Sequence, residues 1–406
     1  MAWLDVQANG LLIAARVMGL LGGDRSGGTL LVPPSGAGSM GDEAMVAGLV
    51  ARLNERGLGP VDVLSRGKTD AWPKIEGLGG FLEDSGGSPA ARFFRILSRL
   101  RRYRRLMVVG ADCIDGYYAA RNSVQMLTIA EAGACMGLEA IIVGASFKEN
   151  AAEPAKRALR RLSSRVALGA RDPISKGRMD ATGARPRLVA DAAFMLDAGE
   201  VPEAGGTRAW LDGQDEAGRT VLGVNFNRQV LPKGSPRVSD LFDAFDRALS
   251  GLLSDRPDLS VLMIPHDYRG EVSDATQAAD LASVLSQQHD GRAHMPTGRL
   301  TAPEAKALAK RCGAVLTGRM HLAIASLGAG TPVACVTYQG KFEGLFKHFS
   351  LEPLCLDPES AIEGAALRSM TEKLLDERDA LRSAVADAWP HVRALSELNL
   401  EGPGAA

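Results

Sequence analysis

Short apolar runs alternate with stretches of helical spacing along the first half of the chain. Apolar runs at 30–32, 61–64, 106–109, 140–143 and 166–168 have the length of buried strands. Between them, residues 43–56, 125–138 and 153–164 carry apolar side chains three and four positions apart. This alternation is typical of a parallel sheet with crossover helices. It predicts one Rossmann-like α/β domain over residues 29–196.

A second alternation follows a change in composition. Residues 197–219 are rich in Gly, Glu, Asp and Ala with little apolar periodicity, which predicts a linker. Apolar runs then return at 221–224, 261–264, 314–316 and 333–336, with helical spacing at 240–254, 275–288, 302–311 and 321–327. We therefore expect a second Rossmann-like domain over residues 220–358.

The two ends of the chain read as helical. Residues 11–21 are apolar but are interrupted by Arg16, and the stretch is shorter than the ~20 apolar residues that span a bilayer. We predict an N-terminal extension, 1–28, whose amphipathic helix packs on the first domain; a membrane-surface anchor is the alternative. Residues 359–406 are expected to form helices broken near Pro390. No transmembrane segment is predicted.

Charge and cysteine content exclude several classes of protein. The 406 residues include 47 Lys and Arg against 48 Asp and Glu, a net charge of −1, so no global field attracts nucleic acid. The basic run at 99–105 contains one tyrosine, Tyr103, but no repeated aromatic residues between its arginines, and it reads as a solvated helix end. Five widely spaced cysteines form neither a CxxC pair nor a metal pattern with the six histidines. A reducing cytoplasm fits best, and no metal is expected.

The most informative segment joins the predicted strand 314–316 to the helix 321–327. Arg319 and His321 lie in the turn between them, at the carboxyl end of the strand. Ligands of open α/β sheets bind at that edge, and a helix N-terminus with an arginine beside it suits an anion. Tyr338 and Lys341 follow the next predicted strand and are expected at the same edge.

Three other loops offer candidate residues. The loop after the first strand contains Gly41, Asp42 and Glu43; it predicts either contacts to a hydroxyl-rich ligand or ordinary turn chemistry. Arg171 follows the strand 166–168 and can point into a cleft or form a turn with its neighbour. His266 closes the strand 261–264 and is a candidate acid or base, although such loop histidines are more often structural.

Together these motifs resemble the polysaccharide pyruvyl transferase family. The matching pieces are GDEA at 41–44, GARD at 169–172, ADAAF at 190–194 and GRMHLAIASLGAGTP at 318–332, followed by Tyr338 and Lys341. The resemblance spans about residues 30–353. It implies a fold similar to GT-B glycosyltransferases, with two Rossmann-like domains facing a cleft and helices at the C-terminus. It also implies transfer of the enolpyruvyl group of phosphoenolpyruvate onto two hydroxyls of a sugar, as a ketal.

This chemistry assigns an expected role to each candidate. Arg171 and Arg319 would each hold one anionic end of phosphoenolpyruvate, His321 would protonate the enol carbon, and Lys341 would offset charge on the departing phosphate. The remaining candidates would bind substrate: Gly41, Asp42 and Glu43 at the sugar, Tyr338 at the shared edge, and His266 as a reserve base.

We therefore expect a cytoplasmic enzyme that uses phosphoenolpyruvate as its donor substrate and needs no cofactor. Its acceptor would be a carbohydrate of a surface polysaccharide or its precursor, with a lipid-linked glycan and a peripheral place at the inner face of the membrane left open. The alternatives are a GT-B glycosyltransferase that uses a nucleotide sugar and a binding subunit without catalytic activity. No nucleic-acid partner is expected.

Overall fold

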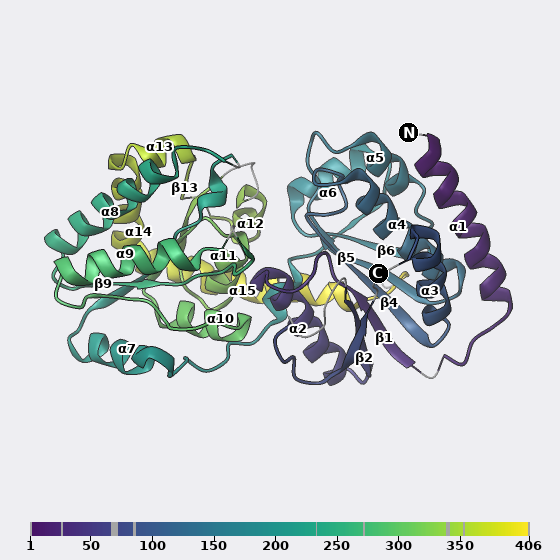
Figure 1. The fold of residues 1–406 in the computed structure, drawn as a ribbon, viewed down its shortest axis with the longest axis horizontal. Coiled ribbons are helices and arrows are strands. Elements are labelled where there is room, and N and C mark those ends of the chain that lie inside the picture. Colours follow the sequence, from purple (N-terminus) through teal and green to yellow (C-terminus); the bar gives the residue numbers. More distant parts are fainter. Residues whose placement is uncertain are drawn as a thin grey trace. The chain divides into compact units, whose positions relative to one another are not determined.

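The chain divides into two compact units, each built around its own parallel sheet (Figure 1). The computed structural model describes residues 2–25, 27–65, 72–83, 87–232, 234–270, 273–337, 342–351 and 354–404. Unit 1 contains Met1–Ala37, Asp42–Leu196 and Val392–Ala406, and unit 2 contains Gly38–Gly41 and Asp197–His391.

Within the described residues, the sheet of unit 1 has seven parallel strands in the order β3-β2-β1-β4-β5-β6-β7. The strands are β1 (Gly27–Val32), β2 (Val61–Ser65), β3 (Leu78–Glu83), β4 (Tyr103–Ala111), β5 (Glu139–Ala145), β6 (Val166–Ala170) and β7 (Arg187–Leu188). The helices are α1 (Ala2–Leu20), α2 (Met40–Glu55), α3 (Pro89–Leu100), α4 (Ala120–Cys135), α5 (Glu153–Arg160) and α6 (Pro173–Ala181). The chain order reverses at β1 and β4, the kind of position where open sheets bind ligands.

Unit 2 repeats the plan. Its described strands are parallel and lie in the order β10-β9-β8-β11-β12-β13. They are β8 (Thr220–Asn225), β9 (Leu259–Met263), β10 (Ala293–His294), β11 (Ala314–Thr317), β12 (Val333–Val336) and β13 (Cys355–Leu356). The helices are α7 (Thr207–Glu216), α8 (Val238–Asp255), α9 (Ala275–Gln288), α10 (Ala302–Arg311), α11 (Met320–Gly328), α12 (Phe342–His348), α13 (Pro358–Ile362), α14 (Ala365–Asp376) and α15 (Arg378–Glu397).

The predicted α/β class is confirmed, and each predicted apolar run is a strand. These strands are buried on both faces, which is why they read as continuous apolar runs. The sequence did not predict β7, β10 and β13, which have two residues each and give too short a pattern, nor the glycine-containing β3.

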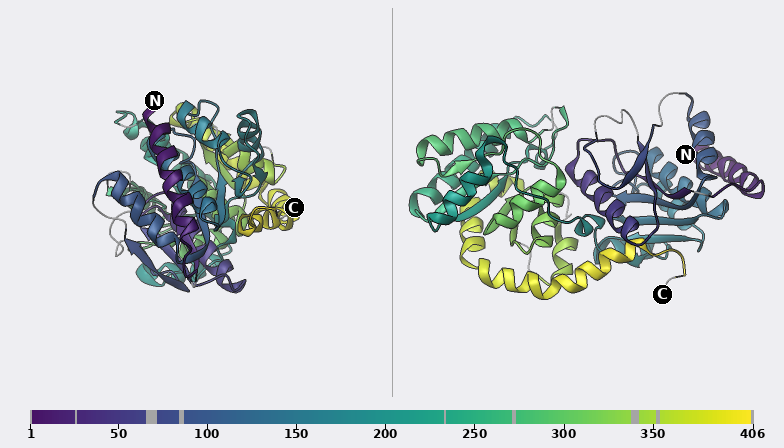
Figure 2. Two further views of the ribbon diagram at one scale, coloured as in Figure 1. Left: turned by 90° about the vertical axis from the view of Figure 1, so that its right-hand side faces the viewer. Right: turned by 90° about the horizontal axis from the view of Figure 1, so that it is seen from below.

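The N-terminal helix packs on unit 1, as predicted. One face of α1 lies against α4 (Figures 1 and 2), with Ala15 fully buried. Leu12 and Met18 pack on the same core. At Gly19 an added Cβ would lie 3.0 Å from the Cα of Met136, so the two helices approach closely at that point.

Two expectations about helix boundaries were wrong. Residues 197–219 were expected to be a linker but contain α7, which buries Leu211 in unit 2. The helix was missed because its other apolar positions are few. The predicted break near Pro390 does not occur, since α15 continues through this residue to Glu397.

The end of α15 belongs to unit 1, where Ser396 Oγ donates to the Asp191 carbonyl at 2.7 Å.

Candidate active site

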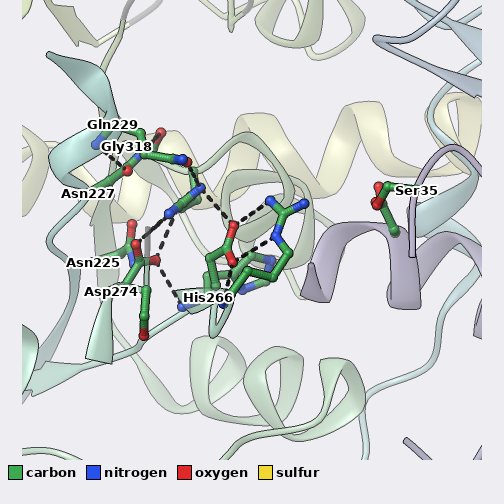
Figure 3. Close-up of polar contacts among 12 residues, drawn as sticks. Ser35, Asn225, Asn227, Gln229, His266, Asp274 and Gly318 are labelled. Carbon is green, nitrogen blue, oxygen red and sulfur yellow. Dashed lines mark hydrogen bonds and ion pairs between the residues drawn. The ribbon is translucent and has the colours of Figure 1, made fainter. Parts of the chain in front are cut away.

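Three neighbouring strands of unit 2 end in polar residues. Asn225 ends β8, His266 follows β9, and Arg319 follows β11. Because these strands are parallel neighbours, their carboxyl ends lie along one edge of the sheet. Figure 3 shows Asn225 and His266 together at this edge, with Asp274 beside them.

The guanidinium of Arg319 is held by Asp274. Its Nη2 donates to Asp274 Oδ1 at 2.6 Å, and its Nε lies 3.2 and 3.1 Å from the two carboxylate oxygens. Asp274 is 1% exposed, and it also accepts hydrogen bonds from Asn225 Nδ2 at 2.9 Å and from the His266 backbone N–H at 3.2 Å. Burial raises the pKa of Asp274, and the ion pair with Arg319 opposes that rise. Asp274 thus links all three strand ends.

A second carboxylate, Asp267, lies on the other side of the arginine. Arg319 Nη1 is 3.2 Å from Asp267 Oδ2 and also donates to Gln229. Asp267 is 2% exposed and also binds Arg269, whose Nη2 donates to Oδ2 at 2.6 Å. Two arginines therefore face two aspartates, so the charge of Arg319 is largely balanced within the cluster.

His266 differs from the other residues of this edge because its ring is buried and both of its ring nitrogens lack hydrogen bonds within the described structure. It is 5% exposed, and neither ring nitrogen has a hydrogen-bond partner among the described residues. Burial, together with the charges of His321 and Arg319, holds the pKa of His266 well below its ordinary value. The ring is therefore neutral at pH 7 and can accept a proton. Buried polar groups normally have partners, so this ring is a candidate for contact with a ligand.

His321, at the start of α11, lies against a glycine. A Cβ added to Gly41 would come within 2.1 Å of His321 Nδ1 and 2.4 Å of its Cγ, so only glycine fits there. The same short segment contacts the loop after β9, because Ser39 forms an antiparallel bridge with Asp267. Gly41, His266 and His321 are thus brought together within unit 2.

The candidates of unit 1 have partners of their own. Arg171 is 3% exposed; its Nη1 lies 3.0 Å from Asp191 Oδ2, and its Nε donates to Ser146 Oγ at 2.6 Å. Burial lowers the pKa of Arg171, but the charges of Asp191 and Asp112 outweigh this effect and raise it. Arg171 stays charged, with its guanidinium turned toward Asp191.

The acidic side chains that follow β1, Asp42 and Glu43, are also buried. Asp42 is 8% exposed and accepts a hydrogen bond from Ser35 Oγ, and Glu43 is 1% exposed in the first turn of α2. Acidic side chains at this position stabilise the helix through its dipole. In the described structure, Asp42 is the more accessible of the two.

A comparison with protein families identifies the chain. The family model described as "Polysaccharide pyruvyl transferase" matches residues 40–340, about three quarters of the sequence. The chain belongs to the polysaccharide pyruvyl transferase family. The match includes Gly41, Arg171, His266, Arg319 and His321, so the cluster of unit 2 lies within the region that defines the family.

Solved structures show the fold. A putative UDP-N-acetylglucosamine 2-epimerase from Listeria monocytogenes has a TM-score of 0.60 at 12% identity, covering 92% of this chain and 94% of that one. A UDP-GlcNAc 2-epimerase from Neisseria meningitidis, bound to UDP-GlcNAc, has a TM-score of 0.56 at 11% identity, with 92% and 98% covered. The chain thus has the GT-B fold, as predicted. None of the curated proteins compared with the chain matches it.

The roles expected for several site residues stay predictions. Tyr338 and Lys341 lie outside the described residues. The roles of Arg171 and Arg319 as donor ligands stay predictions, and the structure adds that each guanidinium already has a carboxylate partner. No group of three or more His, Cys, Asp or Glu residues that could hold a metal occurs within the part of the chain that is described.

Sequence reasoning missed the ion pairs between these carboxylates and the arginines. Asp274 and Asp191 lie 45 and 20 residues from the arginines that they pair with, and no local pattern announces such a pair. Asp267 was visible as the residue next to His266, at the same strand end. An acidic residue beside a candidate histidine is the one signal that would have directed attention to it.

Proposed function

We propose that this pyruvyl transferase moves the enolpyruvyl group of phosphoenolpyruvate onto two hydroxyls of a sugar in a surface polysaccharide or its precursor. The observation that carries the proposal is His266, a buried neutral imidazole that has no hydrogen-bond partner in the part of the chain that the structure describes and lies next to His321 and Arg319 at one sheet edge. Family membership supports the same chemistry.

The reaction balances as follows. A proton is added to the methylene carbon of phosphoenolpyruvate, which gives the neighbouring carbon oxocarbenium character. One sugar hydroxyl forms a C–O bond to that carbon, the C–O bond to phosphate breaks, and the second hydroxyl forms the other C–O bond. The two hydroxyls release two protons: one replaces the proton given to the methylene carbon, and the other leaves with phosphate.

The two histidines have complementary roles in this proposal. His321 protonates the methylene carbon, and His266 accepts a proton from a sugar hydroxyl, since its lowered pKa keeps it neutral at the working pH. Gly41 sets the place of His321 because no larger residue leaves room for the imidazole. Lys341 and Tyr338 are proposed to contact the departing phosphate.

Arg319 binds the donor without leaving Asp274. Asp274 takes the Nε and Nη2 side of the guanidinium and fixes its direction. The donor's anionic group replaces Asp267 at Nη1, and Asp267 keeps Arg269 as its counter-ion. Without a donor, Asp267 and Asp274 balance the charge of Arg319. When the donor binds, its anionic group takes the place of Asp267 and pairs with Nη1.

The enzyme is proposed to work at the inner face of the membrane. No described helix is long and apolar enough to cross a bilayer. The outward face of α1 and the residue that follows it nevertheless expose a row of apolar side chains: Ile13, Val17, Leu20 and then Leu21. At its end, Arg101 Nε donates to the Gly22 carbonyl at 2.8 Å and Arg104 Nε to the Arg25 carbonyl at 3.0 Å. Apolar side chains next to arginines suit the surface of an anionic bilayer.

The proposal is tested with the organism's own polysaccharide as acceptor, after mild acid has removed its pyruvate. Purified protein is incubated with phosphoenolpyruvate, and phosphate release is followed together with a mass increase of one pyruvate less one water. Acceptor-dependent release with this mass change is expected. Transfer from UDP-sugars in place of phosphoenolpyruvate would show instead a nucleotide-sugar glycosyltransferase, and no transfer from either donor would favour a binding subunit.

A further inference from the structure

Two adjacent tyrosines stand exposed on the loop that follows β4. Tyr117 and Tyr118 are 45% and 60% exposed. Their ring centroids are 5.2 Å apart and the ring planes make an angle of 86°. Each tyrosine presents an apolar ring face and a polar hydroxyl, so two adjacent exposed rings offer a surface on which a ligand can pack. The loop begins where β4 ends, at the same sheet edge as the residue that follows β6, Arg171.

The loop is held in place by hydrogen bonds. Asp115 is fully buried, and its Oδ1 accepts the Tyr117 backbone N–H at 2.9 Å. Its carbonyl accepts the Ala152 N–H at 2.8 Å, which ties the loop to the segment before α5. Ser123 Oγ donates to the Cys113 carbonyl at 2.6 Å. The two rings are therefore presented by an ordered loop, which lowers the entropic cost of binding.

Charged groups surround the rings. Lys148 Nζ lies 2.8 Å from the centroid of the Tyr117 ring and 5.7 Å from that of Tyr118. Tyr118 OH donates to Asp112 Oδ2 at 3.0 Å. Burial lowers the pKa of Arg171, and the charge of Asp112 adds to that of Asp191 in raising it, so Asp112 lies near this guanidinium as well. The site thus combines aromatic surface, a carboxylate and an ammonium group beside a candidate residue of the sheet edge.

We infer that Tyr117 and Tyr118 form an acceptor subsite that binds a pyranose ring. The C–H face of a pyranose packs on an aromatic ring, and its hydroxyls donate to a carboxylate such as Asp112 and accept from an ammonium group such as Lys148. A phosphate-bearing ligand is disfavoured, because the carboxylate of Asp112 lies at the same pair of rings as the ammonium of Lys148 and offsets its charge. A neutral, hydroxyl-rich ring suits this balance.

The inference rests on the proposed function, since it gives the sugar acceptor a place on unit 1. It assigns the residues after β4 to acceptor binding and leaves the donor to the cluster around Arg319. It also names the acceptor class: a hexopyranoside with an exposed C–H face, as in β-galactosides and β-glucosides. A substitution at the tyrosines should therefore alter sugar binding without altering phosphoenolpyruvate binding.

The experiment measures both ligands separately on the full chain. Methyl β-D-galactopyranoside and methyl β-D-glucopyranoside are the sugar probes, detected by saturation-transfer NMR, and phosphoenolpyruvate binding is measured by calorimetry. Tyr118→Ala should weaken sugar binding about tenfold, which corresponds to the loss of about 1.4 kcal/mol of stacking on the aromatic ring. Tyr118→Phe should retain most of it, because the ring remains. Phe94→Ala, at an aromatic residue 49% exposed on α3, is the matched control and should bind as the unaltered chain does.

The possible outcomes test the sugar subsite and the proposed function separately. If the unaltered chain binds neither probe, or if Tyr118→Ala binds them as well as the unaltered chain, the subsite is wrong. In that event phosphoenolpyruvate binding still supports the proposed function. If the sugars bind through the tyrosines but phosphoenolpyruvate does not bind at all, the subsite stands and the proposed donor is wrong. Circular dichroism of each variant checks that it is folded.

Discussion

The imidazole of His321 lies directly over Gly41, where even a methyl group would come within 2.1 Å of Nδ1. The contact explains why a glycine precedes Asp42 at the start of α2. It also means that the position of a proposed proton donor depends on the absence of a side chain elsewhere in the sequence. Small residues next to functional rings are therefore part of the site, although they carry no chemistry of their own.

Gly41→Ala should displace His321 and reduce turnover about 100-fold, since misplacing a reacting group by about 1 Å can have that effect. The unfolding midpoint should fall only modestly, because the ring of the half-buried His321 can turn away. The measurement is the pyruvate content of the surface polysaccharide in a deletion strain complemented with each variant. Gly177→Ala is the matched control, since no atom lies within 4 Å of its added Cβ. Equal pyruvate content in both strains would remove His321 from the proposed mechanism.

The two aspartates around Arg319 should have opposite effects on donor binding. Asp267→Asn removes the carboxylate that competes for Nη1, so phosphoenolpyruvate should bind several-fold more tightly, equivalent to about 1 kcal/mol. Asp274→Asn removes the buried anchor, so stability should fall by about 3 kcal/mol or more and turnover should fall with it. Calorimetric binding and urea unfolding measure the two effects.

The proposed roles of the two aspartates depend on whether Asp267→Asn strengthens or weakens phosphoenolpyruvate binding. If Asp267→Asn weakens phosphoenolpyruvate binding as much as Arg319→Ala does, the donor does not replace Asp267, and the carboxylate instead holds Arg319 in its binding position. Asp240→Asn on α8 is a suitable control, since it removes an equal charge from an exposed ion pair with Arg237.

His266→Leu should separate stability from activity. The imidazole buries two nitrogens without partners among the described residues, and an apolar side chain of similar size does not incur that desolvation cost. The free energy of unfolding should therefore stay equal or rise by up to about 2 kcal/mol. Turnover should fall by about 100-fold or more because the proposed base is gone. A variant that loses stability and activity in parallel would show that the ring is structural.

The same residue should make stability depend on pH. The pKa of His266 in the folded chain is lowered, whereas an unfolded histidine titrates near 6.5. As the pH falls below about 6.5, the unfolded state takes up a proton that the folded state excludes, so stability decreases. Urea unfolding at pH 7.5 and 5.5 should show a smaller decrease in His266→Leu than in the unaltered chain. An equal decrease would mean that other groups cause it, His289 and His294 included, whose pKa values burial also lowers.

The sequence predicted where candidate residues gather but not how their charges are balanced. His266 and Arg319 could be placed together because each follows a strand, and parallel strands end at one edge. The pairing of Arg319 with Asp274 could not be predicted, because Asp274 lies in a loop and meets the arginine only through the tertiary fold. Burial of Glu43 was equally hidden, since an acidic residue in a first helical turn is ordinarily exposed.

Secondary structure could be predicted where buried positions are numerous enough to form a pattern of apolar residues in the sequence. Strands such as β4 are apolar on both faces and were visible, whereas α7 buries only one face through Leu211 and was not. The helix α15 contradicted a local rule: Pro390 removes one backbone hydrogen bond, yet the helix continues. Flanking residues buried on its two sides, Val385 and Val392, show that packing supports the helix across that point.

The pair of Arg171 and Asp191 allows a test of whether this arginine touches the donor. Arg171→Met alone leaves a buried carboxylate without its counter-ion and should destabilise the chain by about 3–5 kcal/mol. Adding Asp191→Asn removes that charge while keeping the acceptor for the Ala193 N–H, so much of the stability should return. If Arg171 binds the donor, the folded double variant will still bind phosphoenolpyruvate at least tenfold more weakly. Unchanged binding would make the arginine a structural residue of unit 1.

The apolar face of α1 leads to the last prediction. Leu20 and Leu21 are 89% and 68% exposed, and glutamates there would remove apolar surface and repel anionic headgroups. The unaltered protein should sediment with vesicles of phosphatidylglycerol and phosphatidylcholine, less so in high salt, and not with phosphatidylcholine alone. The double variant Leu20→Glu and Leu21→Glu should stay in solution.

The control for this experiment adds the same charge away from α1. Gln287 and Gln288 are exposed on α9, so their replacement by glutamate changes the net charge equally but leaves the apolar row intact. This control should bind vesicles nearly as well as the unaltered chain. If the two double variants lose binding alike, net charge rather than the surface of α1 governs the association, and a membrane role for this helix is excluded. A soluble acceptor would then suit the enzyme as well as a lipid-linked one.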